Sequence, residues 1–243
     1  VGATRVRFEL REEGLVFAHN GPRDFSITDP AREEEDDAAG RLGDINAITA
    51  VGASTKAENP VAIGKFGVGF KTVFRYTQTP RIYSPKWRFR LERVFIPVAL
   101  EGDFPGREAG ETLFFLPFDK PVCPRKQAYD EIEARLRELL YPTLFLSHLR
   151  SIDVAIRGTH VVYAKESGKP LCFGEGDQAI RAEPVRLTRR AEDREDREAL
   201  LLFSRKTEMG LDYSVGFFLD REGRLCAKPN VPAFCYFRTQ VHT

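Results

Sequence analysis

Residues 63–71, which read Ile-Gly-Lys-Phe-Gly-Val-Gly-Phe-Lys, have the residue types of a phosphate-binding loop. Glycine permits positive φ and has no Cβ, so the backbone N–H groups of residues 67–70 can converge on one anion. Residues 70–76 have helical spacing of apolar side chains, so the unpaired N–H groups at their start would point to the same anion. Lys71 adds a mobile cation. The pattern predicts phosphate binding; the alternative is a glycine-rich turn that only joins two elements.

Two commoner glycine-rich phosphate loops do not fit this segment. A P-loop needs its lysine directly after the last glycine, whereas Phe70 separates Gly69 from Lys71. The dinucleotide fingerprint needs a glycine three residues after Gly69. Thr72 stands there instead, and its β-branched side chain would hinder close packing of helix on strand. The loop is therefore neither of these two types.

The motifs around the glycine loop have a recognisable order. They are His19-Asn20-Gly21, residues 44–48 leading to residues 53–56, the glycine loop, and residues 111–116. This order resembles the ATP-binding domain shared by gyrase, heat-shock chaperones, sensor histidine kinases and mismatch-repair clamps, the GHKL superfamily. The similarity is greatest to the chaperone branch and, within it, to the sacsin-type ATPase module. Residues 143–149 and 234–237 resemble the continuation of sacsin-like proteins more weakly.

The resemblance implies an α+β fold class. The expected architecture is a two-layer α/β sandwich of the Bergerat ATP-binding type, without its first helix, followed by a β-rich second region. We expect an ATP-binding domain over residues 1–120, a connecting helix within residues 121–150 and an incomplete β-rich domain over residues 151–243.

The resemblance also implies a nucleotide site. His19 occupies the position of a family acidic residue that accepts the adenine amino group. A neutral imidazole can accept one hydrogen bond, whereas a protonated one offers two donors. The alternative for His19 is a satisfied histidine at a strand end. Gly21 would keep the wall beside the base low, and Thr112 matches the threonine that reaches the adenine edge. The implied nucleotide-binding residues are His19, Asn20, Gly21, Ser54, Thr55, Lys56, Gly64, Lys65, Phe66, Gly67, Val68, Gly69, Phe70, Lys71 and Thr112.

Two catalytic groups of the family are missing from this chain. A helix that normally ends just before a stretch like residues 2–6 carries a glutamate that activates water and an asparagine that ligates Mg²⁺. Neither Asp44 nor Glu58 has the spacing to replace them. We therefore expect no catalytic residue here, a Mg²⁺ ligand outside the chain, and little or no hydrolysis by this chain alone. In the complete protein, ATP hydrolysis would close and reopen a lid over the nucleotide.

Composition limits the partners. The chain has 243 residues, 42% of them hydrophobic, without a long apolar run or a signal-peptide pattern, so we expect a cytoplasmic protein that binds no membrane. The four cysteines form no Cys-x-x-Cys pair, which predicts neither zinc nor disulfides. A net charge of +1 gives no general attraction to nucleic acid.

The expected partners are ATP and ADP, protein clients or other domains of the same polypeptide, and a second copy in a homodimer. Two rival functions remain: a nucleic-acid-associated clamp, and a nucleotide-binding scaffold without turnover.

Periodicity places these motifs on elements. Residues 5–11 alternate apolar and charged side chains, and the turn at residues 12–14 leads into residues 15–17, which predicts a hairpin. The acidic residues 29–43 read as a solvated loop in the lid region. Apolar positions from Tyr129 to Leu140 predict a helix that stops at Pro142. Further strands are predicted at residues 81–83, 87–96, 112–116, 152–156, 161–163, 199–203, 213–219 and 225–227. Residues 189–197 alternate arginine with acid and read as a solvated face or linker.

Overall fold

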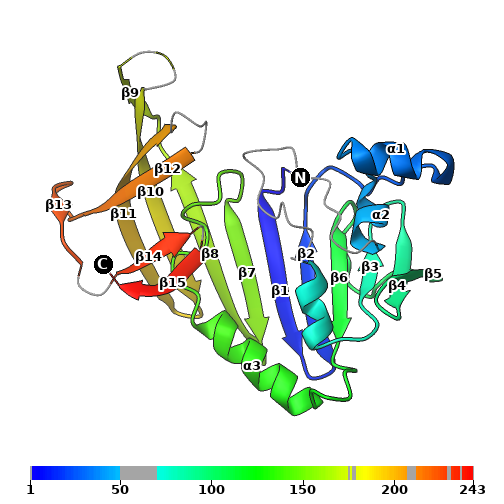
Figure 1. Cartoon of the computed structure of the whole chain (residues 1–243). Helices are drawn as coiled ribbons and strands as arrows, with labels where there is room; N and C mark the ends of the chain where they lie inside the picture. The colour runs from blue at the N-terminus through cyan, green and yellow to red at the C-terminus, as the bar shows by residue number, and fades with distance from the viewer. Residues whose placement is uncertain are drawn as a thin grey trace. The chain divides into compact units, whose positions relative to one another are not determined.

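The computed structural model describes residues 2–49, 70–174, 176, 179–206, 212–228, 231–235 and 237–242. Its chain divides into two compact units, Val1–Ala134 and Arg135–Thr243, called unit 1 and unit 2 below (Figure 1). This division does not test where domains of the whole protein begin and end, so the boundaries at residues 120 and 150 stay predictions.

Unit 1 is built on an antiparallel sheet. Its strands are β1 (Arg5–Arg11), β2 (Gly14–His19), β3 (Arg81–Tyr83), β4 (Arg88–Glu92), β5 (Ile96–Ala99) and β6 (Thr112–Pro117). They lie in the order β1-β2-β6-β3-β4-β5. The predicted hairpin is confirmed, because β1 pairs with β2 from Arg11 opposite Gly14 to Val6 opposite His19. The predicted single strand over residues 87–96 is wrong: Arg93 and Val94 take positive φ and form the turn between β4 and β5.

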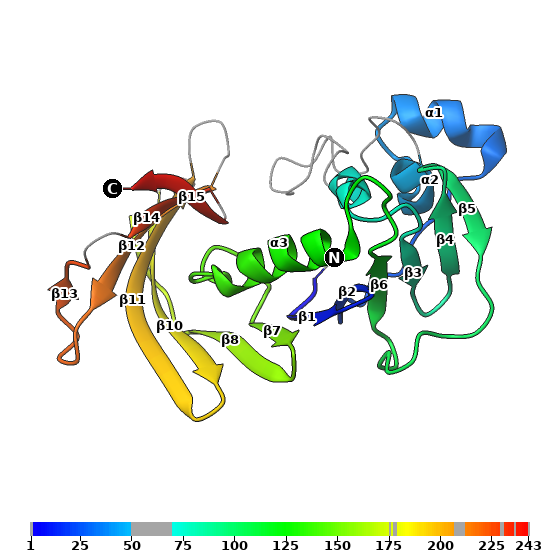
Figure 2. The ribbon, with the colours of Figure 1, turned by 90° about the horizontal axis from the view of Figure 1, so that it is seen from below.

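Both faces of the unit 1 sheet are covered. One face carries a cluster formed by Val16, Ala18, Tyr83, Leu113 and Phe115, with Leu100 and Phe104 packed against it. On the other face, Ile82, Phe89 and Leu91 pack with side chains from two helices. These are α2 (Asp44–Thr49), which contributes Ile45 and Ile48, and η2 (Phe70–Arg75), which contributes Phe70 and Phe74 (Figure 2). Helices thus cover the sheet face toward which His19 points.

The acidic stretch is helical rather than a loop. A short 3-10 helix, η1 (Pro30–Arg32), leads into α1 (Glu33–Ala38). Four acidic residues in the first turn of α1 interact favourably with the positive end of the helix dipole. Asp36 lies 3.5 Å from Arg32 and 3.3 Å from Arg41 in ion pairs. None of the α1 side chains is buried, so apolar periodicity gave no signal for this helix.

Unit 2 consists mainly of strands. They are β7 (Ser151–Ile156), β8 (Thr159–Ser167), β9 (Leu171–Phe173), β10 (Ile180–Ala191), β11 (Arg194–Lys206), β12 (Asp212–Leu219) and β13 (Leu225–Cys226). Their order is β13-β12-β11-β10-β8-β7, with β9 paired to β10. A separate two-stranded sheet contains β14 (Pro232–Cys235) and β15 (Phe237–His242). Leu144, Val185, Leu187, Leu200, Leu202 and Phe218 form the core on one face of the larger sheet.

The predicted two-layer α/β sandwich is wrong. Strands account for 42% of the structure and helices for 18%, so the protein is mostly β-sheet with few helices. Besides the short helices already named, the main helix is α3 (Arg125–Arg137). The largest error concerns β10 and β11: of the two alternatives for residues 189–197, the solvated face is confirmed, since none of them is buried, but the linker is wrong, since they form the turn end of a long hairpin. Charged side chains on both sides of this turn hide the period of two that marks a strand.

Candidate functional site

His19 and Thr112 are brought together by strand pairing. His19 ends β2, Thr112 begins β6, and the two residues lie directly opposite each other. Opposite residues in an antiparallel pair point to the same face of the sheet. On that face Phe17 lies opposite Phe114, with ring centroids 5.7 Å apart. Thr112 is buried. The predicted base-contacting residues therefore adjoin one another at the end of an aromatic surface.

Two further aromatic residues, one from the segment after β2 and one from η2, extend this surface. The ring of Phe114 lies 6.1 Å from Phe25 and 6.0 Å from Phe70, centroid to centroid. Phe70 is the first residue of η2 and directly follows the glycine loop in sequence. The segment after the loop is thereby anchored by an apolar contact on the same face as His19 and Thr112.

The imidazole of His19 already uses one of its nitrogens. The backbone N–H of the buried Gly21 donates to His19 Nδ1 at 3.1 Å. Burial lowers the pKa of His19, which favours the neutral ring. A neutral imidazole that accepts through Nδ1 carries its proton on Nε2. His19 thus offers a donor, and the acceptor expected for an adenine amino group is occupied by Gly21.

Asn20 has a structural role. Its Oδ1 accepts from the backbone N–H groups of Thr4 at 2.9 Å and Arg5 at 2.8 Å, and its Nδ2 donates to Thr4 Oγ1 at 2.9 Å. These bonds fasten the start of β1 to the end of β2. Since both polar ends of the side chain are engaged, Asn20 shapes the site rather than contacting a ligand in this arrangement.

Lys71 is held at the C-terminal end of α2. Its Nζ donates to the backbone carbonyl of Ile48 at 2.9 Å and lies 4.8 Å from the ring centroid of Phe95. Burial lowers the pKa of Lys71. Phe95 belongs to the β4–β5 turn, in which the β-branched Val94 has φ of 75°, a strained conformation for such a residue.

Asp44 anchors the segment that leads from β2 to α2. Its carboxylate accepts from the Ser26 backbone N–H at 3.0 Å and the Ser26 hydroxyl at 2.8 Å, and it pairs with Arg23. The sequence showed only that Asp44 lacks the spacing to replace the missing catalytic groups, and it gave no sign of this anchoring role. Two apolar residues of this helix, Ile45 and Ile48, pack against the sheet.

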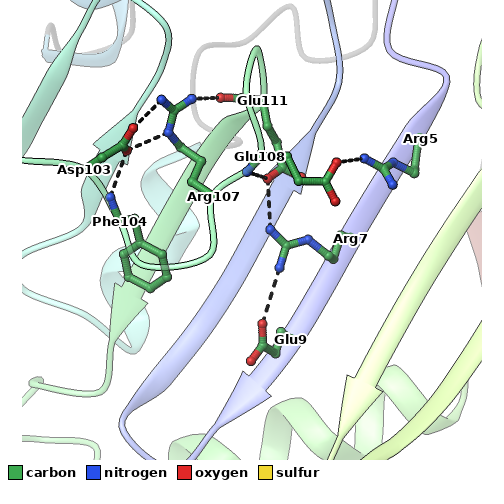
Figure 3. Close-up of polar contacts among 8 residues, drawn as sticks. All are labelled: Arg5, Arg7, Glu9, Asp103, Phe104, Arg107, Glu108 and Glu111. Atoms are coloured by element: carbon green, nitrogen blue, oxygen red, sulfur yellow. Dashed lines mark hydrogen bonds and ion pairs between the residues drawn. The ribbon is translucent and has the colours of Figure 1, made fainter.

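A polar network fixes the strand start that carries Thr112 (Figure 3). Buried Glu111 accepts from Arg7 at 2.9 Å and from the backbone N–H of Glu108 at 3.2 Å. Arg107 donates to the Glu111 carbonyl and pairs with Asp103, and its hydrogen bonds lower the pKa of Asp103 to about 2. Because Glu111 precedes Thr112 directly, this network restricts where the threonine hydroxyl can lie.

The remaining predicted site residues lie outside the described residues. They are Ser54, Thr55, Lys56, Gly64, Lys65, Phe66, Gly67, Val68 and Gly69. Within the described ranges, no group of three or more His, Cys, Asp or Glu side chains could hold a metal ion. None of the helices in those ranges has the length and apolar content needed to cross a bilayer.

Comparison with known proteins gives one family match. Residues 27–91, which include α2, the glycine loop and η2, match the Sacsin domain family. No curated protein matches the chain. Among solved structures, the chain is similar to the N-terminal domain of a DNA repair protein, with a TM-score of 0.41 and 9% sequence identity. That match covers 76% of this chain and 62% of the other, and similarity at this level carries no argument about function.

Proposed function

We propose that this chain is the nucleotide-binding part of a sacsin-like protein. It binds ATP through unit 1, and the complete protein hydrolyses the ATP to close and reopen a lid. The observation that carries the proposal is the pairing of His19 with Thr112 beside an aromatic surface. The Sacsin domain match over residues 27–91 supports it, because that range holds the glycine-rich segment.

Base recognition follows from the hydrogen-bonding groups on this face. The rings of Phe17 and Phe114 provide apolar area for a purine. His19 Nε2–H donates to an acceptor on the base, such as a ring nitrogen, and the Thr112 hydroxyl can accept from the adenine amino group. This differs from an acidic residue, which would accept from that amino group directly.

Phosphate recognition requires a change at Lys71. The glycine-rich segment ends immediately before Phe70, so a triphosphate held there lies close in sequence to Lys71. To pair with a phosphate, Nζ has to exchange the Ile48 carbonyl and the Phe95 ring for the anion. Binding therefore includes the release of Lys71 from its present contacts.

Hydrolysis needs groups beyond those described here. We assign the Mg²⁺ ligand and the residue that activates water to segments outside this chain. Mg²⁺ would neutralise phosphate charge when bound. The contribution of this chain is to bind and orient the nucleotide. We place the protein in the cytoplasm, which the free thiols of Cys123, Cys172 and Cys226 support.

A nucleotide-binding scaffold without turnover is the second candidate function. The engagement of Lys71 Nζ by the Ile48 carbonyl favours it, because this lysine is not positioned for catalysis in the present arrangement. A phosphate-release assay on the full-length protein separates the two functions. Release of phosphate that requires Mg²⁺ excludes the scaffold.

Calorimetric titration with ATP tests the proposal. The Gly67→Ala/Gly69→Ala double variant should bind ATP at least roughly tenfold more weakly with an unchanged melting temperature, because added Cβ atoms block convergence of the amides. Gly216→Ala in unit 2 is the control, since its Cβ would meet only side-chain atoms at 3.6 Å. Unchanged ATP affinity in the double variant would refute the assignment of the loop.

Comparison of ATP with inosine triphosphate tests the role of His19. Inosine carries a keto oxygen where adenine carries the amino group, so a His19 that donates at this position, rather than to the neighbouring ring nitrogen, should bind inosine triphosphate at least as tightly as ATP. His19→Asp supplies an acceptor and should shift the preference toward ATP. A wild-type protein that strongly prefers ATP, with no shift in His19→Asp, would show that His19 does not contact the base.

A further inference from the structure

Unit 2 exposes apolar side chains on one face of its sheet. We call these residues the apolar face; they are Leu171, Phe173, Ile180, Tyr213, Val215 and Phe217, with exposed fractions from 38% to 62%. Strand register places them together. Ile180 lies opposite Phe173 across β9 and β10. Phe203 of β11 lies opposite both Ala182 and Val215, and its ring lies 5.8 Å from that of Phe217.

The opposite face of the same sheet is covered. Leu200, Leu202 and Phe218 are buried there, and Tyr141, Phe145 and Val231 pack against their cluster. Neighbouring residues along a strand point to opposite faces, so Phe217 is exposed while Phe218 is buried. The described part of the chain therefore supplies a second layer to one face of this sheet and leaves the apolar face accessible.

Charged residues near one end of this side of the sheet form ion pairs with one another. Toward the β10–β11 turn, Arg186 pairs with Glu166 at 3.3 Å, and Arg190 pairs with Glu195 at 2.6 Å. Arg197 pairs with the same Glu195. Opposite residues share a face, so these pairs lie on the same side as the apolar face. Three arginines against two carboxylates leave one net positive charge at this end of the sheet, so an apolar partner surface matches the patch better than the dense negative charge of nucleic acid or an anionic membrane.

We propose that the apolar face is covered by a second copy of this chain, with the two unit 2 sheets packed face to face. A two-fold axis places the same patch against itself, and an apolar patch with internally paired charges is compatible with that arrangement. Aromatic side chains bury about 150–250 Å² each when fully covered. Six large side chains at roughly half exposure thus supply roughly 600 Å², close to the ~800 Å² per partner of a standard interface.

Sedimentation of the chain over a dilution series tests this dimer. The wild type should dimerise with a dissociation constant on the order of micromolar, because the interface is apolar but slightly below standard size. Val215→Lys/Phe217→Lys should weaken dimerisation at least roughly a hundredfold, since two buried charges would face each other across the axis. Phe173→Lys, on a different strand, should weaken it in the same way.

The control is Val122→Lys, which changes an 82% exposed apolar residue of unit 1 and should leave the dimer intact. Far-ultraviolet circular dichroism checks that each variant is folded. A wild type that stays monomeric throughout the series overturns the proposal. A dimer that persists in both the folded Val215→Lys/Phe217→Lys variant and the folded Phe173→Lys variant also overturns it. A monomeric wild type whose apolar face binds an extended apolar peptide would likewise overturn it.

Discussion

The two units differ in how their sheets are covered. In unit 1, separate clusters on the two faces bury Leu113 on one side and Ile82 on the other. In unit 2, one face buries Leu200 and the other exposes Val215 and Phe217. A sheet covered on both faces can hold polar side chains in fixed positions for a ligand. A sheet with one uncovered apolar face is suited to association.

The polar contacts of the two units also differ in burial: those of unit 1 are buried, whereas most of those in unit 2 are exposed. In unit 1, buried carboxylates of Asp44 and Glu111 bind backbone and arginine groups that fix the edges of the candidate site. In unit 2, the ion pairs around the β10–β11 turn are exposed and contribute little to stability. Buried Lys165, which donates to the Leu146 carbonyl, is an exception.

The largest expected effect separates the two faces of unit 2. Leu200→Ala should destabilise the protein by about 2–5 kcal/mol, because it leaves a cavity in a packed core. Leu201→Ala changes the neighbouring half-buried leucine, which lies opposite Phe217 on the other side of the sheet, and should cost less than about 1 kcal/mol under monomeric conditions. Urea unfolding measures both. Equal losses would mean that the two faces are covered alike.

The next effect tests the carboxylate anchor of unit 1. Asp44→Ala should lower the free energy of unfolding by about 2–3 kcal/mol, since the Ser26 donors and Arg23 lose a buried acceptor. Asp37→Ala, an exposed aspartate of α1, is the matched control and should change stability by less than about 0.5 kcal/mol. A loss at Asp44 no larger than at Asp37 would contradict the anchoring role.

A smaller effect concerns pH. The folded-state pKa of His19 lies below its ordinary value of 6.5, so the unfolded chain binds a proton more readily. Stability should be highest above pH 6.5 and should fall as the pH drops below 6.5 toward the folded pKa. His19→Gln should remove this contribution. Urea midpoints of the two proteins between about pH 7.5 and 5.5 measure it, and parallel profiles would count against a neutral His19.

The smallest expected effect is a change in ATP affinity when the contact between Lys71 and Phe95 is removed. This prediction rests on the proposed nucleotide binding. Phe95→Leu removes the ring beside Lys71 Nζ, a contact worth about 0.5–1 kcal/mol. Lys71 should then reach a phosphate more easily, and ATP should bind about two- to fivefold more tightly. Ile96→Leu, at the next exposed position, is the control. Weaker ATP binding in Phe95→Leu would indicate that the ring instead assists binding.

Sequence reasoning succeeded where one face of an element is apolar and the other polar. The β1–β2 hairpin and a helix from Tyr129 to Leu140 were predicted on that basis, and both elements are present, although α3 begins earlier, at Arg125, and already ends at Arg137. It failed for α1, which buries nothing, and for β10, where Pro184 and several arginines interrupt the pattern. The predicted α+β class with its two-layer α/β sandwich was wrong, because strands make up 42% of the structure and helices only 18%.

Local sequence patterns also predicted the candidate site only in part. The sequence pointed to His19, Asn20 and Thr112, but strand pairing decided that only His19 and Thr112 adjoin. The side chain of Asn20 accepts hydrogen bonds from the backbone of Thr4 and Arg5. The carboxylate of Asp44 accepts from the Ser26 backbone and so holds the segment before α2 in place. Such roles depend on partners 15 to 18 residues away, which no local spacing reveals.

By itself the sequence determined the local preferences of this protein: a glycine-rich segment of the type that predicts anion binding, the alternation that makes strands, and an almost neutral charge. Only the tertiary structure decided which nitrogen of His19 is engaged, where Lys71 is held and which face of unit 2 stays exposed. The physical reason is that residue type and spacing fix periodicity, whereas hydrogen-bond partners and burial are set by segments that meet only after folding.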